Sequence, residues 1–213
     1  MKRSTKLLSM LVASALFAGA LVGCGGGDKK KAAGDVIKIG GNLEMTGGSA
    51  SYGIASKMGM ELAIDQINAK GGIGGKKLAL VVADNKSEAA EGTNAMTKLV
   101  SQDKVVAVVG PNLSSSVIAA SAVNNSAKVL DITPMGTNEN VTVDKATKKV
   151  RPYNFRACFI DPFQGLIMSK YVKEELKLNK TAIYIDNSSD YAKGLAASFV
   201  ENYKKLGGTI VTT

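Results

Sequence analysis

The sequence predicts an α/β protein built on doubly wound parallel sheets. From Val36 onward, short apolar stretches alternate with stretches of helical periodicity, and such repeated strand–helix units place their strands parallel to one another. The stretch Val105–Val109 is apolar throughout, which is typical of a strand buried on both faces of a parallel sheet. The hydrophobic content of 45% is enough for a substantial core.

The first 23 residues predict a signal peptide. Lys2, Arg3 and Lys6 precede an apolar stretch, Leu7–Val22, that is short for a membrane span. An ordinary secretory signal or a short anchor helix would share these features.

The leader ends in Leu-Val-Gly-Cys, with the cysteine at position 24. This motif resembles a bacterial lipobox, and the resemblance implies that Cys24 carries a lipid. Residues 24–35 are rich in Gly and Lys and predict a flexible tether. We therefore expect a secreted protein that the lipid on Cys24 anchors to the membrane, at its outer face or in the periplasm.

Twelve elements are expected after the tether. In order, they are strand 36–39, helix 52–69, strand 78–83, helix 87–101, strand 105–109, helix 115–124, strand 128–132, extended segment 153–158, helix 161–178, strand 182–185, helix 191–206 and strand 209–211.

Three details of packing follow from periodicity and capping rules. In the first helix, every fourth residue from Ile54 through Met58 to Leu62 is apolar and predicts the face that packs on the sheet. Small residues beside that face would permit a close approach, namely Ala55, Gly59 and Ala63. The second helix is expected to turn four residues inward, namely Ala89, Thr93, Met96 and Val100. Asp161-Pro162 predicts a helix start with Asp161 as the N-cap.

Several function classes are disfavoured by composition. The formal charge is +9, but three of the basic residues lie in the leader, and the others are dispersed apart from the short run Lys29–Lys31. No nucleic-acid partner is therefore expected. The chain has no His and two Cys, which removes Ser-His-Asp and Cys-His chemistry and His-based metal sites. We expect no catalytic residue, no cofactor and no metal ion, and Cys158 should be a buried free thiol. The Gly-rich segment 71–77 lacks the spacing of a phosphate loop and precedes a strand, so it predicts a turn.

Four polar loops follow predicted strands and should meet at one edge of the sheet, where open α/β sheets bind ligands. They are Thr46–Tyr52, Gly110–Ser116, Thr133–Thr137 and Asp186–Tyr191. The serines of 114–116 either bind an anion at the start of a helix or cap that helix. Because the loops offer hydroxyls, Gly and Tyr rather than paired acids, they predict a site that holds a small polar molecule.

A resemblance to a known family extends from Val36 to the end. It rests on short motifs in order: Ile37-Lys38-Ile39-Gly40, Thr46-Gly47, Ala50-Ser51-Tyr52-Gly53, residues 67–73, Lys98-Leu99-Val100, Val108-Val109-Gly110, Ser114-Ser115-Ser116, Thr133-Pro134, Phe155-Arg156, Asp161, Gln164-Gly165, Tyr191 and Gly194-Leu195-Ala196. Together they resemble the periplasmic leucine/isoleucine/valine-binding proteins. The sequence departs from that family at Glu44-Met45, where Pro-Leu is frequent.

The resemblance implies a two-lobed type I periplasmic-binding-protein fold that closes on its ligand. Lobe I would span residues 36–160 with the hinge crossing, and lobe II would start at 161 and be truncated, because the family runs well beyond residue 213. By the same resemblance, Ser114 and Thr137 would hold the ligand α-carboxylate, and the Met135 carbonyl would face its α-ammonium. The remaining implied residues are Tyr52 and Tyr191, which would close over the ligand, and Asn112 and Leu113, which would line the near wall.

The function implied is capture of a small amino acid, with branched-chain side chains favoured, for an ABC transporter permease. Another ligand, such as an amide or an aromatic acid, is the first alternative. A lipid-anchored sensor and a secreted enzyme are the others.

Overall fold

The computed structural model describes residues 36–212, and this part of the chain forms two parallel sheets. In chain order the elements are β1 (Ile37–Leu43), α2 (Ala50–Ala69), β2 (Leu78–Asp84), α3 (Ala89–Ser101), β3 (Ala107–Val109), α4 (Ser114–Ala127), β4 (Leu130–Thr133), the 3-10 turn η1 (Glu139–Val141), β5 (Asn154–Arg156), α5 (Asp161–Lys170), the π turn η2 (Tyr171–Glu175), β6 (Lys180–Ala182), α6 (Asp190–Lys205) and β7 (Thr209–Thr212). The predicted signal peptide and tether lie outside the described residues. Within residues 36–212, no helix combines the length and the apolarity needed to cross a membrane.

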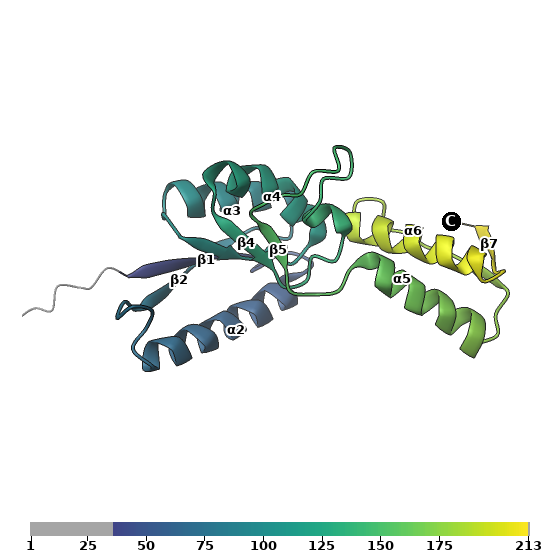
Figure 1. Ribbon diagram of the computed structural model, residues 1–213, viewed down its shortest axis with the longest axis horizontal. Coiled ribbons are helices and arrows are strands. Elements are labelled where there is room, and N and C mark those ends of the chain that lie inside the picture. The colour runs from purple at the N-terminus through teal and green to yellow at the C-terminus, as the bar shows by residue number, and fades with distance from the viewer. Residues whose placement is uncertain (1–35, 213) are drawn as a thin grey trace, which may run out of the picture. The chain divides into compact units, whose positions relative to one another are not determined.

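The larger sheet has the strand order β2-β1-β3-β4-β5, and all its neighbouring strands are parallel. Helices α3 and α4 cover one face of this sheet and α2 covers the other (Figure 1). This arrangement confirms the predicted doubly wound α/β fold. Because the strands are parallel, the loops after β1, β3 and β4 reach the same edge of the sheet.

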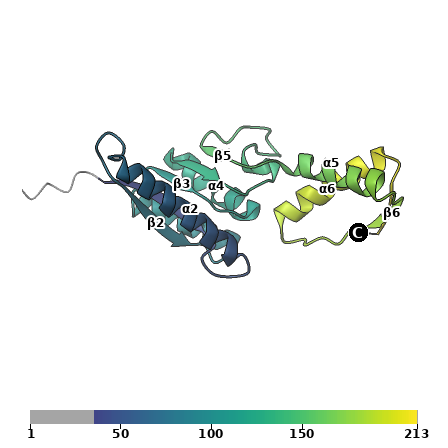
Figure 2. The ribbon, with the colours of Figure 1, turned by 90° about the horizontal axis from the view of Figure 1, so that it is seen from below.

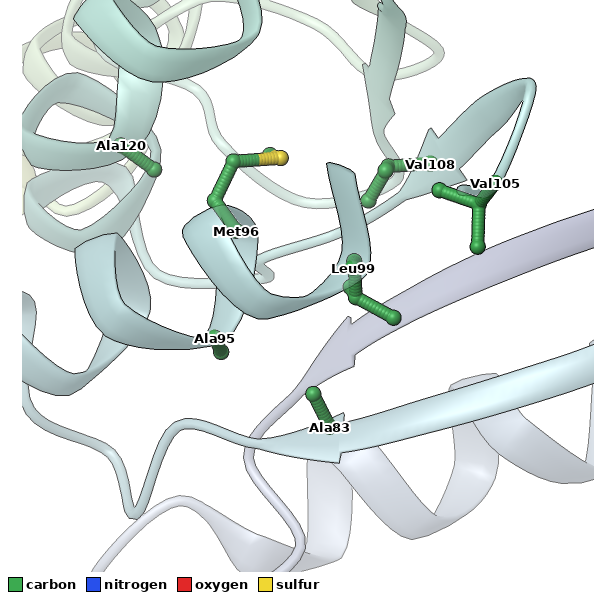
Figure 3. Packing of buried hydrophobic residues seen from close by; sticks show 7 residues of the cluster. All are labelled: Ala83, Ala95, Met96, Leu99, Val105, Val108 and Ala120. Atoms are coloured by element: carbon green, nitrogen blue, oxygen red, sulfur yellow. The ribbon is translucent and has the colours of Figure 1, made fainter. Parts of the chain in front are cut away.

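The main core lies between this sheet and helices α3 and α4. Met96 and Leu99 of α3 are fully buried, as is Val108 of β3. The cluster consists of Ala83, Ala95, Met96, Leu99, Val105, Val108 and Ala120 (Figure 3). Truncation of a buried Leu or Met in such a core costs about 2–5 kcal/mol, so this contact fixes α3 and α4 on the sheet.

The smaller sheet pairs β6 with β7 in parallel. Helices α5 and α6 pack side by side (Figure 2), and a side chain at Gly165 of α5 would overlap Ser198 of α6. Tyr203 of α6 is fully buried, and its hydroxyl donates a hydrogen bond of 2.8 Å to the carbonyl of Leu178. The glycine thus allows two helices to approach closely, and the tyrosine secures the loop that leads to β6.

The face of α2 that packs on the sheet differs from the predicted face. Ile54, Met58 and Leu62 are 46%, 64% and 60% exposed, whereas Gly53 is buried and Met60 is half-buried on the same face as Gly53. The prediction was wrong because α2 carries apolar residues on two faces, and periodicity cannot choose between them. The close approach that it assigned to the Gly59 side occurs at Gly53, which lies against the backbone of Glu44.

Other details also differ from the prediction. In α3 the buried residues are Gly92, Ala95, Met96 and Leu99. Of the four residues expected to face inward, Met96 is buried, Val100 is partly buried against the core, and Ala89 and Thr93 are half-buried. Val106 is 59% exposed, so the 105–109 segment is not buried on both faces. Helix α5 ends at Lys170, before the predicted 178, and continues as the π turn. Its N-cap is Ile160, and Asp161 is the first helical residue.

The two glycines of α2 provide a matched pair for testing this packing. A methyl group at Gly53 would overlap the carbonyl oxygen of Glu44, whereas one at Gly59 would meet no heavy atom within 4 Å. Gly53→Ala should therefore lower the free energy of unfolding by about 2 kcal/mol or more. Gly59→Ala should raise it by about 0.5–1 kcal/mol, because alanine loses less backbone entropy in a helix. Equal effects in urea denaturation would contradict the observed orientation of α2.

A buried carboxyl group lies on β4 under α4. Asp131 is fully buried, and its Oδ2 accepts a hydrogen bond of 3.1 Å from the Asn154 side-chain amide. Its Oδ1 has no partner among the described residues. Because burial disfavours the charged form, the pKa of Asp131 is raised well above its ordinary value of 3.8.

This pKa shift predicts a pH-dependent stability. A raised pKa in the folded state means that the native protein holds the Asp131 proton more tightly than the unfolded chain does. The free energy of unfolding should therefore fall as pH rises from about 4 through the folded-state pKa. Asp131→Asn should remove this fall and stabilise the protein at pH 7 by about 1 kcal/mol or more.

Urea denaturation between pH 4 and pH 8 measures the effect of Asp131. The exposed Asp65 of α2 gives the control Asp65→Asn, which should retain the pH dependence of the wild type. If Asp131→Asn retained it as well, the buried carboxyl group would not be its source.

Candidate functional site

A cavity of about 700 Å³ lies at the carboxyl edge of the larger sheet. All seven ligand-binding residues predicted from the sequence line it: Tyr52, Asn112, Leu113, Ser114, Met135, Thr137 and Tyr191. The four predicted rim loops all contribute to its wall. The structure therefore brings together residues that are up to 139 positions apart, from Tyr52 to Tyr191.

The start of α4 forms one wall of the cavity. The helix begins at Ser114, its N-cap residue is Leu113, and no side chain of its own caps it. The carboxylate of Glu44, fully buried after β1, accepts hydrogen bonds from the backbone amides of Asn112 at 3.1 Å and Leu113 at 3.3 Å. A carboxylate from another loop therefore caps α4 in place of the serines.

Both ends of the Asn112 side-chain amide form hydrogen bonds within this wall. Its amide group donates to Glu44 at 2.7 Å, and its Oδ1 accepts from the Ser56 hydroxyl of α2 at 3.0 Å. Asn112 therefore ties α4 to β1 and α2, and it shapes the wall.

The serine and threonine hydroxyls of the cavity are buried. Ser114 is 3% exposed, and its Oγ accepts from the backbone amide of Asn138 at 3.2 Å, which leaves its proton available to an acceptor. The hydroxyls of Ser116 and Thr137 are also buried, and neither forms a hydrogen bond of good geometry with the described residues, although the Thr137 hydroxyl lies beside the carboxylate of Asp161. Buried hydroxyls of this kind are normally hydrogen-bonded, so these two are candidates for binding a ligand.

The loop after β4 is tied to the loop before α4. The hydroxyl of Thr133 donates to the carbonyl of Pro111 at 2.6 Å and accepts from the amide of Gly136 at 2.9 Å. These bonds fix the positions of Met135 and Thr137 relative to Ser114.

The two tyrosines lie at the rim. Tyr52 is 48% exposed and Tyr191 is 38% exposed, and the Tyr191 hydroxyl accepts from the Gln164 side-chain amide at 3.1 Å. Phe159 also lines the cavity. The rim thus supplies aromatic surface, while the buried wall supplies hydroxyls.

The amino end of α6 is hydrogen-bonded to two of the rim loops. The backbone amide of Asp190 donates to the Ser115 hydroxyl at 3.0 Å, and its carbonyl accepts from the Asn138 side chain at 2.7 Å. Ser115 and Asn138 are the neighbours in sequence of Ser114 and Thr137. The same two loops therefore line the cavity and contact α6.

Asp161 lies at the crossing between the two sheets. It is 1% exposed, and a side chain at Gly194 of α6 would overlap its carboxylate. Burial raises the pKa of Asp161, and the nearby Thr137 hydroxyl and Arg156 charge oppose this shift without cancelling it. Neither carboxylate oxygen forms a hydrogen bond of good geometry with the described residues. Instead of capping α5, the side chain fills the space between Thr137 and α6.

The first rim loop is held by Asp84 at the end of β2. The Asp84 carboxylate accepts from the Thr46 hydroxyl at 2.7 Å and from the Met45 amide at 3.0 Å. Burial alone would raise the pKa of Asp84, but hydrogen bonds from Thr46, Lys86 and Met45 outweigh burial and lower the pKa. This loop is therefore anchored by a carboxylate that stays ionised.

Sequence reasoning missed several residues of the cavity. Ser116, Phe159 and Gln164 line it, although only Ser116 belonged to a predicted rim loop. Glu44 was noted as a departure from the family and not as part of the site. Glu44 directly follows β1, but the predicted strand ended at residue 39, and Asp186 also follows a predicted strand, so no sequence signal singled out Glu44.

The segment Gly71–Lys77 forms the predicted turn, closed by the pairing of Ile73 with Lys76. Cys158 is a free thiol, as expected, but it is half-buried instead of buried, and burial raises its pKa. Among residues 36–212, no group of three or more His, Cys, Asp or Glu could hold a metal ion.

Comparison with known proteins agrees with this architecture. The family model described as periplasmic binding protein matches residues 36–213. An amino acid binding protein of Pseudomonas aeruginosa is 39% identical over 162 residues, which are 76% of this chain and 42% of that protein.

Solved structures give the same result. The branched-chain amino acid transporter substrate binding protein LivJ of Streptococcus pneumoniae, in complex with isoleucine, has a TM-score of 0.75 and 47% identity, covering 84% of this chain and 49% of that one. The leucine binding protein LivK of Thermotoga maritima has a TM-score of 0.76 and 31% identity, covering 83% of this chain and 48% of that one.

This chain spans about half the length of the solved relatives and less than half of the curated one. The relatives confirm the resemblance to leucine/isoleucine/valine-binding proteins and the type I fold. With a family match over all the described residues, this chain belongs to the periplasmic binding protein family.

Proposed function

We propose that this chain captures a branched-chain amino acid outside the cell membrane and delivers it to the permease of an ABC importer. The observation that carries the proposal is the set of buried hydroxyls at the start of α4 and after β4, which face one cavity at the carboxyl edge of the sheet. The relative from S. pneumoniae was solved with isoleucine, which supports the choice of ligand.

The α-carboxylate of the ligand would lie at the start of α4. The hydroxyls of Ser114 and Thr137 would donate to it, and the positive end of the helix dipole would stabilise its charge. The carbonyl of Met135 would accept from the α-ammonium. Both ends of an amino acid can thus be held by neutral groups.

The aliphatic side chain of the ligand would contact the aromatic rim. Tyr52 and Tyr191 would close over it, with Leu113 and Phe159 beside them. Burying apolar surface contributes about 25 cal/mol per Å², so a larger aliphatic side chain should bind more tightly until it exceeds the space available.

The arrangement supports binding rather than catalysis. The cavity wall offers hydroxyls and aromatic rings beside the charged side chains of Lys86, Glu88 and Asp186. The chain has no His, and the family consists of binding proteins. We also propose that residues 36–160 and 161–213 belong to two lobes, with the crossing near Asp161, and that their closure couples ligand capture to docking on the permease.

Loss of either carboxylate-binding hydroxyl should weaken binding of leucine, isoleucine and valine. Ser114→Ala and Thr137→Ala should each cost about 1–3 kcal/mol, the usual effect of losing a hydrogen bond to a charged group. Isothermal titration calorimetry with the mature full-length protein measures this cost. Ser101→Ala, at the exposed end of α3, is the matched control and should bind like the wild type. Wild-type affinity in both site variants would place the ligand elsewhere.

The lipid anchor is proposed from the sequence around Cys24. Cys24→Ala should release the protein from the membrane fraction or leave it as an unprocessed precursor. Fractionation and mass spectrometry of the amino terminus distinguish these two results, and Cys158→Ala is the matched control. A Cys24→Ala protein that is processed and retained like the wild type would contradict the proposal.

A further inference from the structure

Glu44 carries a buried charge beside the cavity wall. Its side chain is fully buried, and its carboxylate accepts hydrogen bonds from four uncharged donors: the side-chain amides of Asn85 and Asn112 and the backbone amides of Asn112 and Leu113. Among the ion pairs formed by residues 36–212, none involves Glu44. Neutral donors hold the charge in place but do not cancel it.

The Glu44 carboxylate already binds backbone amides at the amino end of α4, which a ligand anion could otherwise use. The amino end of a helix carries about half a positive charge, and Glu44 bonds to the amides of the two residues that precede the helix. A second anion at the same helix end would feel the remaining attraction of the dipole and the repulsion of Glu44. Because Glu44 is buried, solvent and salt screen that repulsion weakly.

The cavity lies directly across this wall from Glu44. Asn112 and Leu113, which bond to the carboxylate, also line the cavity, and Ser114 follows them. On the cavity side, the hydroxyls of Ser116 and Thr137 are buried and form no hydrogen bond of good geometry with the described residues, although the Thr137 hydroxyl lies beside the carboxylate of Asp161. These unsatisfied hydroxyls indicate that a polar ligand group belongs close to the charge of Glu44.

We infer that Glu44 makes the cavity select zwitterions over simple carboxylate anions, because only a ligand with a positive group beside its carboxylate compensates the buried charge. A monocarboxylate of the same shape would meet the repulsion alone. A zwitterion adds an ammonium group that Glu44 attracts. This inference rests on the proposed function, since it concerns the same cavity and narrows its class of ligand.

The test compares leucine with 4-methylpentanoate, which has the same carbon skeleton without the amino group. The quantity measured by calorimetry is the ratio of their dissociation constants, 4-methylpentanoate over leucine. Glu44→Gln removes the charge and keeps an oxygen that can accept from the α4 amides, so it should lower this ratio about 10-fold. The control is Glu61→Gln, in which an exposed carboxylate of α2 is removed with the same change of net charge. Its ratio should equal that of the wild type, and an unchanged ratio in Glu44→Gln would overturn the inference.

A measurement on the wild type covers the case in which Glu44→Gln does not fold. The neutral amide 4-methylpentanamide should bind at least as tightly as 4-methylpentanoate, because it escapes the repulsion. Tighter binding of the anion than of the amide would refute the role of Glu44.

Acetate titration separates this inference from the proposed function. Backbone amide shifts of Ser114–Ser116 in NMR spectra should report an acetate dissociation constant about 10-fold lower in Glu44→Gln than in the wild type. If leucine did not bind but this difference appeared, the proposed ligand would be wrong and the charge selection correct. If leucine bound and acetate affinity were equal or undetectable in both proteins, the selection would be wrong and the proposed function would stand.

Discussion

The contacts of Glu44 hold together the edge of the sheet on which the cavity depends. Its carbonyl oxygen lies against Gly53, which sets how closely α2 approaches β1. Its carboxylate bonds to Asn85 after β2 and to the Asn112-Leu113 pair before α4. One residue thus positions the ends of β1 and β2 and the starts of two helices. Because buried carboxylates are costly unless they are well hydrogen-bonded, its surroundings have little freedom to rearrange, and the wall of the cavity is correspondingly rigid.

The rigid wall at the start of α4, which offers neutral donors, suits a ligand that carries both charges. A cationic side chain would bind the carboxylate of an amino acid strongly, but it would also bind phosphates and simple acids. Hydroxyls at a helix start bind a carboxylate through directed hydrogen bonds. Their contribution depends on geometry more than on net charge, so they favour one shape of ligand. Glu44 adds a negative charge behind this wall. The repulsion of a ligand anion by Glu44 and its attraction by the α4 dipole together determine which net charge of the ligand is favoured.

The elements that could be predicted from the sequence were those governed by local rules. Alternating strands and helices, the parallel sheet and the meeting of the loops after β1, β3 and β4 all follow from periodicity and from the topology of parallel strands. The fourth rim loop follows β6 of the smaller sheet, so this rule does not account for its place at the cavity. The packed face of α2 could not be predicted, since Ile54 and Met60 lie on different faces and both are apolar. The contact between Gly53 of α2 and Glu44 after β1 selects the face of α2 that packs on the sheet. This contact joins two different elements, so the periodicity of the helix does not reveal it. The sequence predicted Asp161 as a helix cap, but its side chain is buried against α6. Rules based on neighbouring residues in sequence do not predict that contact.

Hydrogen bonds from the two central rim loops link the cavity to α6. Ser114, Ser115 and Thr137 line the cavity, and Ser115 and Asn138 bond to Asp190 at the start of α6. A further bond joins the Asn138 amide to the Ser114 hydroxyl, so these hydrogen bonds form a closed ring with Asp190. A shift of α6 would therefore pull on the residues next to the cavity-lining hydroxyls without any intervening element. Coupling between a ligand and a helix needs two arrangements that both sites bias, and this ring joins the cavity wall to α6 directly.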